Sequence, residues 1–248
     1  MSKPTVGIFG LTGCAGDQLV ILDCEDQLLD LVSLIDIRDF LMASSENDDV
    51  CPLDIALVEG AVLSNKDAER LQAIRKRAKI LVALGTCAVW AGVAAMDGSA
   101  DRRERLVEVY GETGLSYDSV PAQALHEIVK VDLNVTGCPI EKDHFLAAVA
   151  NLLNGDAPIY PEYPVCTECR MLENNCLLIE RGELCCGPIT AAGCKARCPN
   201  LRVPCVGCRG PVGDANSSSL LAKFEEKGFD RHDVAARLRT FAPQGGAQ

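Results

Sequence analysis

The 248-residue sequence has no excess of positive charge and no long apolar run. Its 24 Lys and Arg face 35 Asp and Glu, for a formal net charge of −11, and this argues against nucleic-acid binding because phosphates favour Lys and Arg. No run approaches the roughly 18 apolar residues of a membrane-spanning helix, and no start segment has the basic, apolar and small-residue order of a secretory signal. We expect a cytoplasmic protein without a nucleic-acid partner or membrane span.

Cysteine, by contrast, is abundant, with 14 residues. In a reducing compartment such a count indicates metal ligation or redox chemistry rather than disulfides. Of the nine cysteines in the C-terminal third, eight fall into two groups of four. The first set is Cys166, Cys169, Cys176 and Cys185, and the second set is Cys194, Cys198, Cys205 and Cys208. Soft thiolates in fours select zinc or iron–sulfur clusters over magnesium or calcium.

The spacing of the two sets favours iron–sulfur clusters over zinc. Structural zinc sites usually consist of two close pairs separated by a dozen or more residues. Here the intervening residues number two, six and eight in the first set, and three, six and two in the second. Such spacing suits a cubane cluster, which is larger than one ion. A zinc-stabilised binding module without a redox role is the alternative.

The N-terminal two thirds alternate between short apolar runs and helical patterns. The runs predict strands over 5–10, 54–60, 79–85 and 131–137. Helices are predicted from Leu19 to Val32, over 66–76 with Asn65 as a possible N-cap, and over about 141–153. This alternation predicts an α/β fold with a parallel sheet covered on both faces.

A proline-containing stretch over 158–164 marks a domain boundary. We therefore expect an α/β domain over 1–157 and a small, irregular cysteine-rich domain over 158–248. Glycine and proline are so frequent in the second domain that a hydrophobic core cannot be its main support. We therefore expect the metal sites to stabilise it. Near its end, 220–241 is expected to form two short helices that break at Gly228.

Three of the four predicted strands are followed by a cysteine in a glycine-bearing turn, and these edge cysteines are Cys14, Cys87 and Cys138. A free cysteine taken alone is more often a small buried hydrophobe. However, the carboxyl ends of parallel strands meet at one edge of a sheet. Three thiols at equivalent positions there predict one shared centre.

Cysteine, glycine and proline motifs run through nearly the whole chain. In order they are LTGCAG at 11–16, GTCA at 85–88, GCP at 137–139, GPITAAGC at 187–194, RCP at 197–199 and PCVGCRG at 204–210. This order resembles the small subunit of nickel–iron hydrogenases. It is most similar to the delta subunit of the cytoplasmic bidirectional sulfhydrogenases, which couple hydrogen to NADP or NAD, and the F420-reducing hydrogenases are near relatives.

The resemblance implies a flavodoxin-like N-terminal domain and three 4Fe-4S clusters. Position by position, the edge cysteines match proximal ligands, the first set matches the distal ligands and the second set the medial ligands. The proximal cluster would face the nickel–iron centre of a separate large subunit. Electrons would pass towards a flavin-bearing NAD(P)-reducing subunit and an iron–sulfur subunit. The chain has no nucleotide-binding fingerprint. It also lacks the paired terminal Cys-x2-Cys motifs that mark that large subunit, so alone it should have no hydrogenase activity.

At one position the chain departs from the resembled pattern. Most relatives have Cys-x2-Cys at the first turn, whereas here the second position is Asp17. The F420-reducing relatives resemble this arrangement, so we hypothesise that the Asp17 carboxylate completes the proximal cluster. Two alternatives stay open: Asp17 caps the following helix and leaves a three-iron cluster, or Cys24, on the same helical face, completes it.

Three further points depend on the resemblance. Cys186 could replace its neighbour Cys185 as a ligand, although the family spacing selects Cys185. Glu59, at a strand end near the proximal site, could relay protons or simply be solvated. A subunit of a quinone-reducing complex would share the proximal domain, but it usually has adjacent cysteines there and lacks the eight C-terminal ones.

Overall fold

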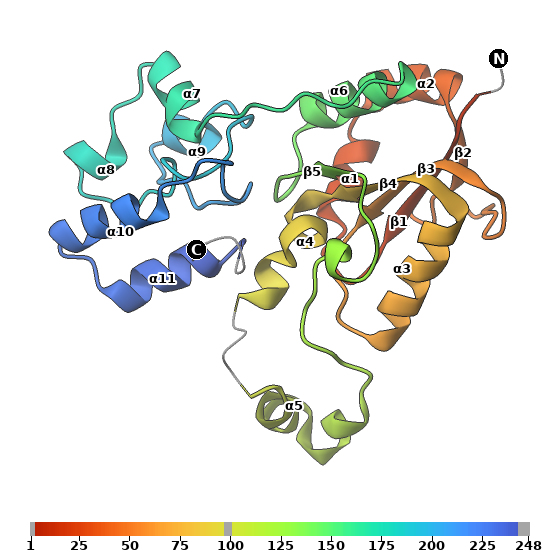
Figure 1. Cartoon of the computed structure of the whole chain (residues 1–248), viewed down its shortest axis with the longest axis horizontal. Helices are drawn as coiled ribbons and strands as arrows, with labels where there is room; N and C mark the ends of the chain where they lie inside the picture. The colour runs from red at the N-terminus through yellow and green to blue at the C-terminus, as the bar shows by residue number, and fades with distance from the viewer. Residues whose placement is uncertain (1–2, 97–100, 243–248) are drawn as a thin grey trace.

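A computed structural model describes residues 3–96 and 101–242. Its centre is a parallel sheet of β1 (Thr5–Gly10), β2 (Asp36–Asp39), β3 (Leu53–Glu59), β4 (Ala78–Leu84) and β5 (Leu133–Val135), in the order β2-β1-β3-β4-β5 (Figure 1). In the register, Val6 lies beside Ile55, and Leu84 beside Val135. The two central strands β3 and β4 are almost continuously apolar, as expected for strands that are buried on both faces.

Helices cover both faces of the sheet. On one face lie α1 (Gly16–Leu22), α2 (Glu25–Leu34) and α6 (Lys142–Leu153), and on the other lie α3 (Asn65–Arg77) and α4 (Gly85–Trp90) (Figure 1). Alternate residues of β1, β3 and β4 enter the two cores, because side chains alternate across a strand. In β3, Leu57 enters the core under α6, and Val58 enters the core under α3. The predicted doubly covered α/β fold is confirmed.

Local differences from the predicted elements have physical causes. The strand β2 was not predicted because it is short and has the polar sequence DIRD. The single helix predicted from Leu19 to Val32 is wrong: α1 ends at Leu22, and Cys24 is the N-cap of α2. The N-cap of α3 is Ser64, whose Oγ accepts a hydrogen bond from the Asp67 N–H, and not Asn65.

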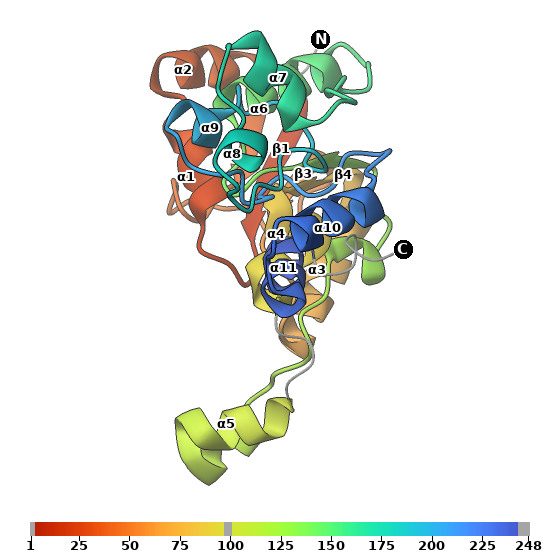
Figure 2. The same ribbon diagram turned by 90° about the vertical axis from the view of Figure 1, so that its left-hand side faces the viewer.

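A hairpin-like arm projects from the sheet domain after α4. It contains α5 (Arg102–Tyr110) and η2 (Gly111–Ser116), and Figure 2 shows it extending well away from the rest of the chain. The short η1 (Gly92–Ala95) precedes it and η3 (Leu125–Glu127) follows it. No residue of α5 is buried, so within the described structure this helix adds nothing to the apolar cores.

The cysteine-rich region begins after residues 154–164, which contain no helix or strand. It consists of loops with five helices: α7 (Val165–Met171), α8 (Leu177–Glu180), α9 (Arg197–Asn200), α10 (Ser217–Glu226) and α11 (Arg231–Arg239). As predicted, Gly228 separates the last two helices, with φ of +82°. A small core joins these helices, in which Phe224 is fully buried and packs edge-on against Phe229. Among the described helices, none is both long and apolar enough to cross a membrane.

Polar contacts connect the cysteine-rich region to the sheet domain. Arg197 pairs with Glu141 at 2.6 Å, and Lys195 pairs with Asp143 at 2.7 Å. Elsewhere along this junction, Gly210 lies against the indole of Trp90, where an added Cβ would overlap Nε1. The two regions therefore meet along the loops that bear the cysteines.

Candidate metal centres

The edge cysteines come together at the carboxyl end of the sheet. Cys14 follows β1, Cys87 lies in α4 directly after β4, and Cys138 follows β5. Burial raises the pKa of the Cys138 thiol to about 11, and the nearby charges of Cys87, Asp17 and Cys14 add to the increase. Burial likewise raises the pKa of Cys87 to about 11, with Asp17 and Cys14 contributing. The three thiols and the carboxylate are thus electrostatic neighbours, although they are far apart in the sequence.

Glycines allow this close approach. A Cβ added at Gly16 would be 3.2 Å from the Cys14 Sγ and 3.8 Å from the Pro139 Cβ. At Gly85 an added Cβ would overlap the carboxylate of Asp17, and the φ of +83° itself favours glycine. The carboxylate of Asp17 therefore lies directly against the turn that leads to Cys87.

Asp17 is buried, with 6 % of its surface exposed. Its Oδ1 accepts a hydrogen bond of 2.7 Å from the Ile140 N–H, in the loop that follows Cys138. Burial raises the pKa of Asp17 to about 7, which this hydrogen bond opposes and the charge of Glu59 reinforces. The helix-capping alternative is wrong, because the N-cap of α1 is Ala15 and no side chain caps that helix.

Cys24 lies in the apolar core beneath the sheet. It is fully buried in the cluster that includes Ile21 and Leu31, and its Sγ donates to the Val20 carbonyl at 3.3 Å. Because α1 ends before Cys24, the predicted shared helical face with Asp17 does not exist. Cys24 therefore has the environment of a packing residue.

Glu59 ends β3 and is 2 % exposed, so the alternative of a solvated glutamate is wrong. Its Oε2 accepts a hydrogen bond of 3.0 Å from the backbone N–H of Gln18, next to Asp17. Its negative charge also contributes to the raised pKa values of Asp17 and Cys138. The edge site thus contains two buried carboxyl groups beside its three thiols.

The first set lines a single cavity, together with apolar residues of α8 and neighbouring loops. The cavity is lined by Val165, Cys166, Cys169, Cys176, Leu177, Leu178, Cys185, Gly187, Pro188 and Pro199. Burial raises the pKa of the Cys166 thiol to about 12, with contributions from Cys185, Cys169 and Cys176. A Cβ added at Gly187 would lie 3.3 Å from the Cys166 Sγ, so the glycine keeps this cavity open.

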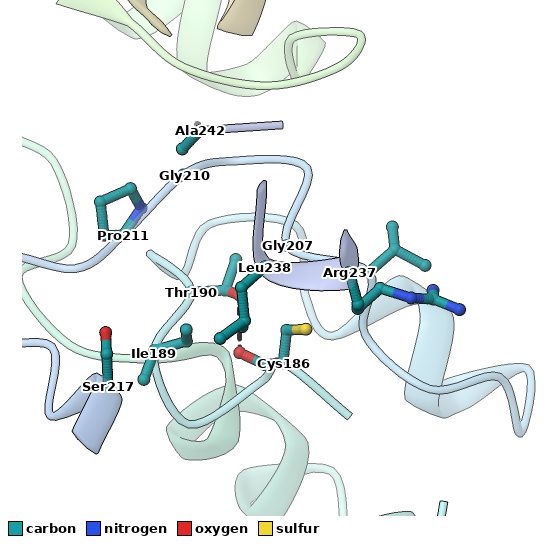
Figure 3. Close-up of a pocket in the computed structure, with 11 residues that line it drawn as sticks. Cys186, Ile189, Thr190, Gly207, Gly210, Pro211, Ser217, Arg237, Leu238 and Ala242 are labelled. Atoms are coloured by element: carbon teal, nitrogen blue, oxygen red, sulfur yellow. Dashed lines mark hydrogen bonds between the residues drawn. The ribbon is translucent and has the colours of Figure 1, made fainter. Parts of the chain in front are cut away.

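Cys186 points into a different cavity from Cys185. Figure 3 shows it among Ile189, Thr190, Arg237 and Leu238, on the side of α11. It is 1 % exposed, and burial raises the pKa of its thiol to about 12. The structure thus puts Cys185, and not Cys186, in the cavity of the first set.

The second set lies between the other two sites. Burial raises the pKa of Cys208 to about 11, the charges of Cys194 and Cys198 reinforce this, and the nearby backbone of Cys138 opposes it. Cys205 is the most buried member, and its backbone N–H donates to the Cys185 Sγ at 3.3 Å. The second set therefore contacts the edge site through Cys208 and the first set through Cys205.

The ligand atoms of the cysteine sets are spaced more widely than those around a single bound metal ion. Across the described residues, only Asp230, His232 and Asp233 bring three ligand atoms within 4.8 Å of one another, and these exposed residues form the start of α11. Tetrahedral zinc, with Zn–S bonds of about 2.3 Å, needs sulfur atoms roughly 3.8 Å apart. Thiol-lined sites with wider spacing fit iron–sulfur clusters, whose irons are held by cysteine thiolates.

Comparison with known proteins agrees with this geometry. The sequence model of the family described as NADH ubiquinone oxidoreductase, 20 Kd subunit, matches residues 14–152, which include the whole edge site. Over nearly the full length, the chain is 36% identical to the sulfhydrogenase 2 subunit delta of Pyrococcus furiosus, covering 96% of this chain and 98% of that protein. The chain therefore belongs to the family described as NADH ubiquinone oxidoreductase, 20 Kd subunit, and within it is a hydrogenase small subunit.

Further similarities extend this assignment. The subunit is 31% identical to the delta subunit of the NAD-reducing hydrogenase HoxS of Cupriavidus necator, over 62% of this chain and 80% of that protein. A crystal structure of an NAD+-reducing nickel–iron hydrogenase in the hydrogen-reduced state matches with a TM-score of 0.57 and 28% identity, over 64% of this chain and 96% of that one. The hydrogenase small subunit is thus part of an oxidoreductase complex, and the predicted family is confirmed.

Proposed function

We propose that this hydrogenase small subunit carries electrons through three 4Fe-4S clusters. In this proposal the domain 1–157 holds the proximal cluster at the edge site, and the domain 158–248 holds the medial cluster in the second set and the distal cluster in the first set. The subunit works in the cytoplasm. It connects the nickel–iron site of a large subunit with a flavin-bearing NAD(P)-reducing subunit and its iron–sulfur partner.

The contact chain between the three sites is the observation that carries this proposal. The hydroxyl of Thr86, the residue before Cys87, donates to the Cys208 carbonyl oxygen, and the Cys205 N–H donates to the Cys185 sulfur. Each link joins a residue of one site to a cysteine of the next. Three separate structural metal sites would not need such contacts, whereas a relay needs its centres close together.

The ligand set of the proximal cluster follows from the edge site. Cys14, Cys87 and Cys138 would supply thiolates, and Asp17 would supply a carboxylate oxygen as the fourth ligand. Asp17 is buried, faces the Cys87 turn and caps no helix. An oxygen ligand is harder than sulfur and favours ferric iron, so this cluster should have a lower reduction potential than its all-cysteine counterpart.

One exposed cysteine lies at each end of the series of three metal sites, and these two positions suggest where the partner subunits bind. Cys14 is exposed at the edge site, and Cys176 is exposed at the first set. Around Cys176, large apolar side chains are also exposed, namely Met171, Leu172, Ile179 and Leu201. We assign the large subunit to the Cys14 end and the electron-accepting subunit to the Cys176 end. The similarity to the NAD+-reducing hydrogenase supports an NAD(P)-linked acceptor.

Metal analysis of the intact complex tests this function. The complex would be purified anaerobically through a tag on this subunit and analysed for iron, acid-labile sulfide, zinc and EPR signals. We expect about twelve irons on this chain, three spin systems and a nickel-bearing partner that consumes hydrogen. Stoichiometric zinc without iron or sulfide would contradict the proposal and favour a structural binding module.

A further inference from the structure

Arg209, the residue after Cys208, is a buried cation. Only 3 % of its surface is exposed. Its Nε donates to the carbonyl oxygens of Ala191 and Ala192, at 3.2 and 2.9 Å. Its Nη2 lies 3.0 Å from the Nδ1 of His144 on α6, and its Nη1 is buried without a hydrogen-bond partner. The guanidinium is thus held firmly between the cysteine-rich region and the sheet domain.

No anion in the described part of the chain neutralises Arg209. None of the ion pairs within 4.0 Å that these residues form includes its guanidinium. Glu168 lies nearby, but its carboxylate oxygens accept hydrogen bonds from the backbone N–H groups of Gly193 and Ala196. His144 supplies no negative charge either, because an imidazole is neutral or positively charged. Burial and the Arg209 charge lower its pKa and so favour the neutral form.

The position of Arg209 indicates which group supplies the missing negative charge. A Cβ added at Gly193 would lie 2.9 Å from its Nη2, so the guanidinium packs against the turn that leads to Cys194. Arg209 thus follows Cys208 directly in the chain, and its guanidinium lies against the residue that precedes Cys194. Four thiolates give an iron–sulfur cluster a net negative charge, and a buried unpaired cation is costly without such a partner.

We propose that Arg209 is the counter-charge of the cluster in the second set and raises its reduction potential. Reduction adds an electron to an already negative cluster. A fixed cation beside the cluster stabilises the reduced form more than the oxidised form, because net charge and local electrostatics set cluster potentials. Arg209 is a positioning and tuning residue and not a cluster ligand. This inference rests on the proposed cluster assignment.

The test is an EPR-monitored redox titration of the anaerobically purified complex. The signal of the second set would be identified as the one that changes in a Cys198→Ser variant. In Arg209→Met, the ratio of reduced to oxidised cluster at a given potential should fall about tenfold, a lowering of about 59 mV for one electron. Arg209→Lys keeps the charge and should remain close to wild type.

Arg197→Met is the matched control. Arg197 also adjoins a cysteine of the second set, but its side chain is 61% exposed and pairs with Glu141. Solvent and the glutamate screen its charge, although that charge still opposes the rise that burial causes in the pKa of Cys198, so the midpoint of the cluster should fall by clearly less than in Arg209→Met. An unchanged midpoint in Arg209→Met, or an equal decrease in Arg209→Lys, would overturn the inference.

If the Arg209→Met complex assembles without the cluster of the second set, the Arg209→Lys variant shows whether the positive charge is what the cluster requires. A retained cluster in Arg209→Lys would show that the charge is needed, in support of the inference, whereas equal loss in both variants would overturn it. The iron and sulfide content of the wild-type complex is measured first. A wild type without clusters would refute the proposed function, while a cluster-bearing wild type with no effect of Arg209→Met would refute only this inference.

Discussion

The hydroxyl of Thr86 donates a hydrogen bond of 2.5 Å to the carbonyl oxygen of Cys208, 122 residues further along the chain. The hydroxyl oxygen of Thr86 in turn accepts a bond of 3.2 Å from the N–H of Gly137. One buried side chain therefore joins the turns that bear Cys87 and Cys138 to a cysteine of the second set. The edge site and the second set are built as one unit, and their relative position depends on this threonine.

Removal of this hydroxyl should loosen the junction. Thr86→Val is nearly isosteric but leaves the Gly137 N–H and the Cys208 carbonyl without a partner. We expect a loss of about 1–3 kcal/mol in the free energy of unfolding, measured anaerobically by denaturant titration. The control is Thr113→Val, since the Thr113 hydroxyl bonds an exposed carbonyl in the arm and its loss should cost less than about 0.5 kcal/mol. Equal effects would contradict the role of Thr86.

The ligand role of Asp17 predicts a specific change in one EPR signal. Asp17→Cys would replace a hard oxygen ligand by a soft thiolate, so the midpoint potential of the proximal cluster should rise and its EPR signal should change. Asp17→Ala should alter or abolish that signal.

Cys24 provides the comparison for the Asp17 variants. Cys24→Ala removes a buried sulfur from the apolar core, so it should lower stability by about 1 kcal/mol and leave every cluster signal as in wild type. An unchanged proximal signal in Asp17→Ala would disprove ligation by Asp17, and a signal lost in Cys24→Ala would assign the ligand to Cys24.

The two adjacent cysteines 185 and 186 should behave differently. Cys185→Ser changes a residue of the thiol-lined cavity, so the distal cluster signal should change or disappear with the loss of up to about four irons per chain. Cys186→Ser lies in the other cavity and should retain the full iron content. Iron analysis and EPR of both variants check this. Loss of iron from the Cys186 variant would mean that the ligand assignment is reversed.

Metal removal should affect the two domains unequally. The sheet domain has two large apolar cores, whereas the cysteine-rich region has one small core that includes Cys185 and Cys205. Anaerobic chelation should therefore make 158–242 sensitive to limited proteolysis while residues of the sheet stay protected. Mass spectrometry of the fragments checks this, and cleavage distributed evenly over both domains would contradict it.

In metal-depleted protein, Asp17 should make the stability of the sheet domain depend on pH. Its pKa is about 7 in the folded chain against 3.8 ordinarily, so the folded state retains a proton that the unfolded state releases. Stability should fall as the pH rises from about 4 to 7, by at most about 1.4 kcal/mol per unit. Denaturant titrations of wild type and Asp17→Asn over this pH range check this, because the free energy of unfolding of the variant should lack this decrease with pH. Parallel plots of the free energy of unfolding against pH for the two proteins would contradict the prediction.

Much of the sheet domain could be predicted from the sequence because its signals are local. The central strands β3 and β4 are almost continuous apolar runs, and glycine-bearing turns mark their ends. The edge strand β2 and the arm around α5 escaped prediction because their residues are polar and their conformation depends on neighbours. The break at Cys24 also depends on tertiary packing, since the apolar pattern from Leu19 to Val32 runs through it without interruption.

By itself, the sequence determined the number of thiols, their grouping into two sets and three strand ends, and the hydrogenase motifs. These are properties of residue type and spacing, which remain the same however the chain packs. Only the tertiary structure decided that Asp17 is buried against the Cys87 turn, that Cys185 and Cys186 face different cavities, and that Arg209 has no counter-ion among the described residues. Burial and charge neighbours arise from contacts between segments that are far apart in the chain, and no local pattern encodes them.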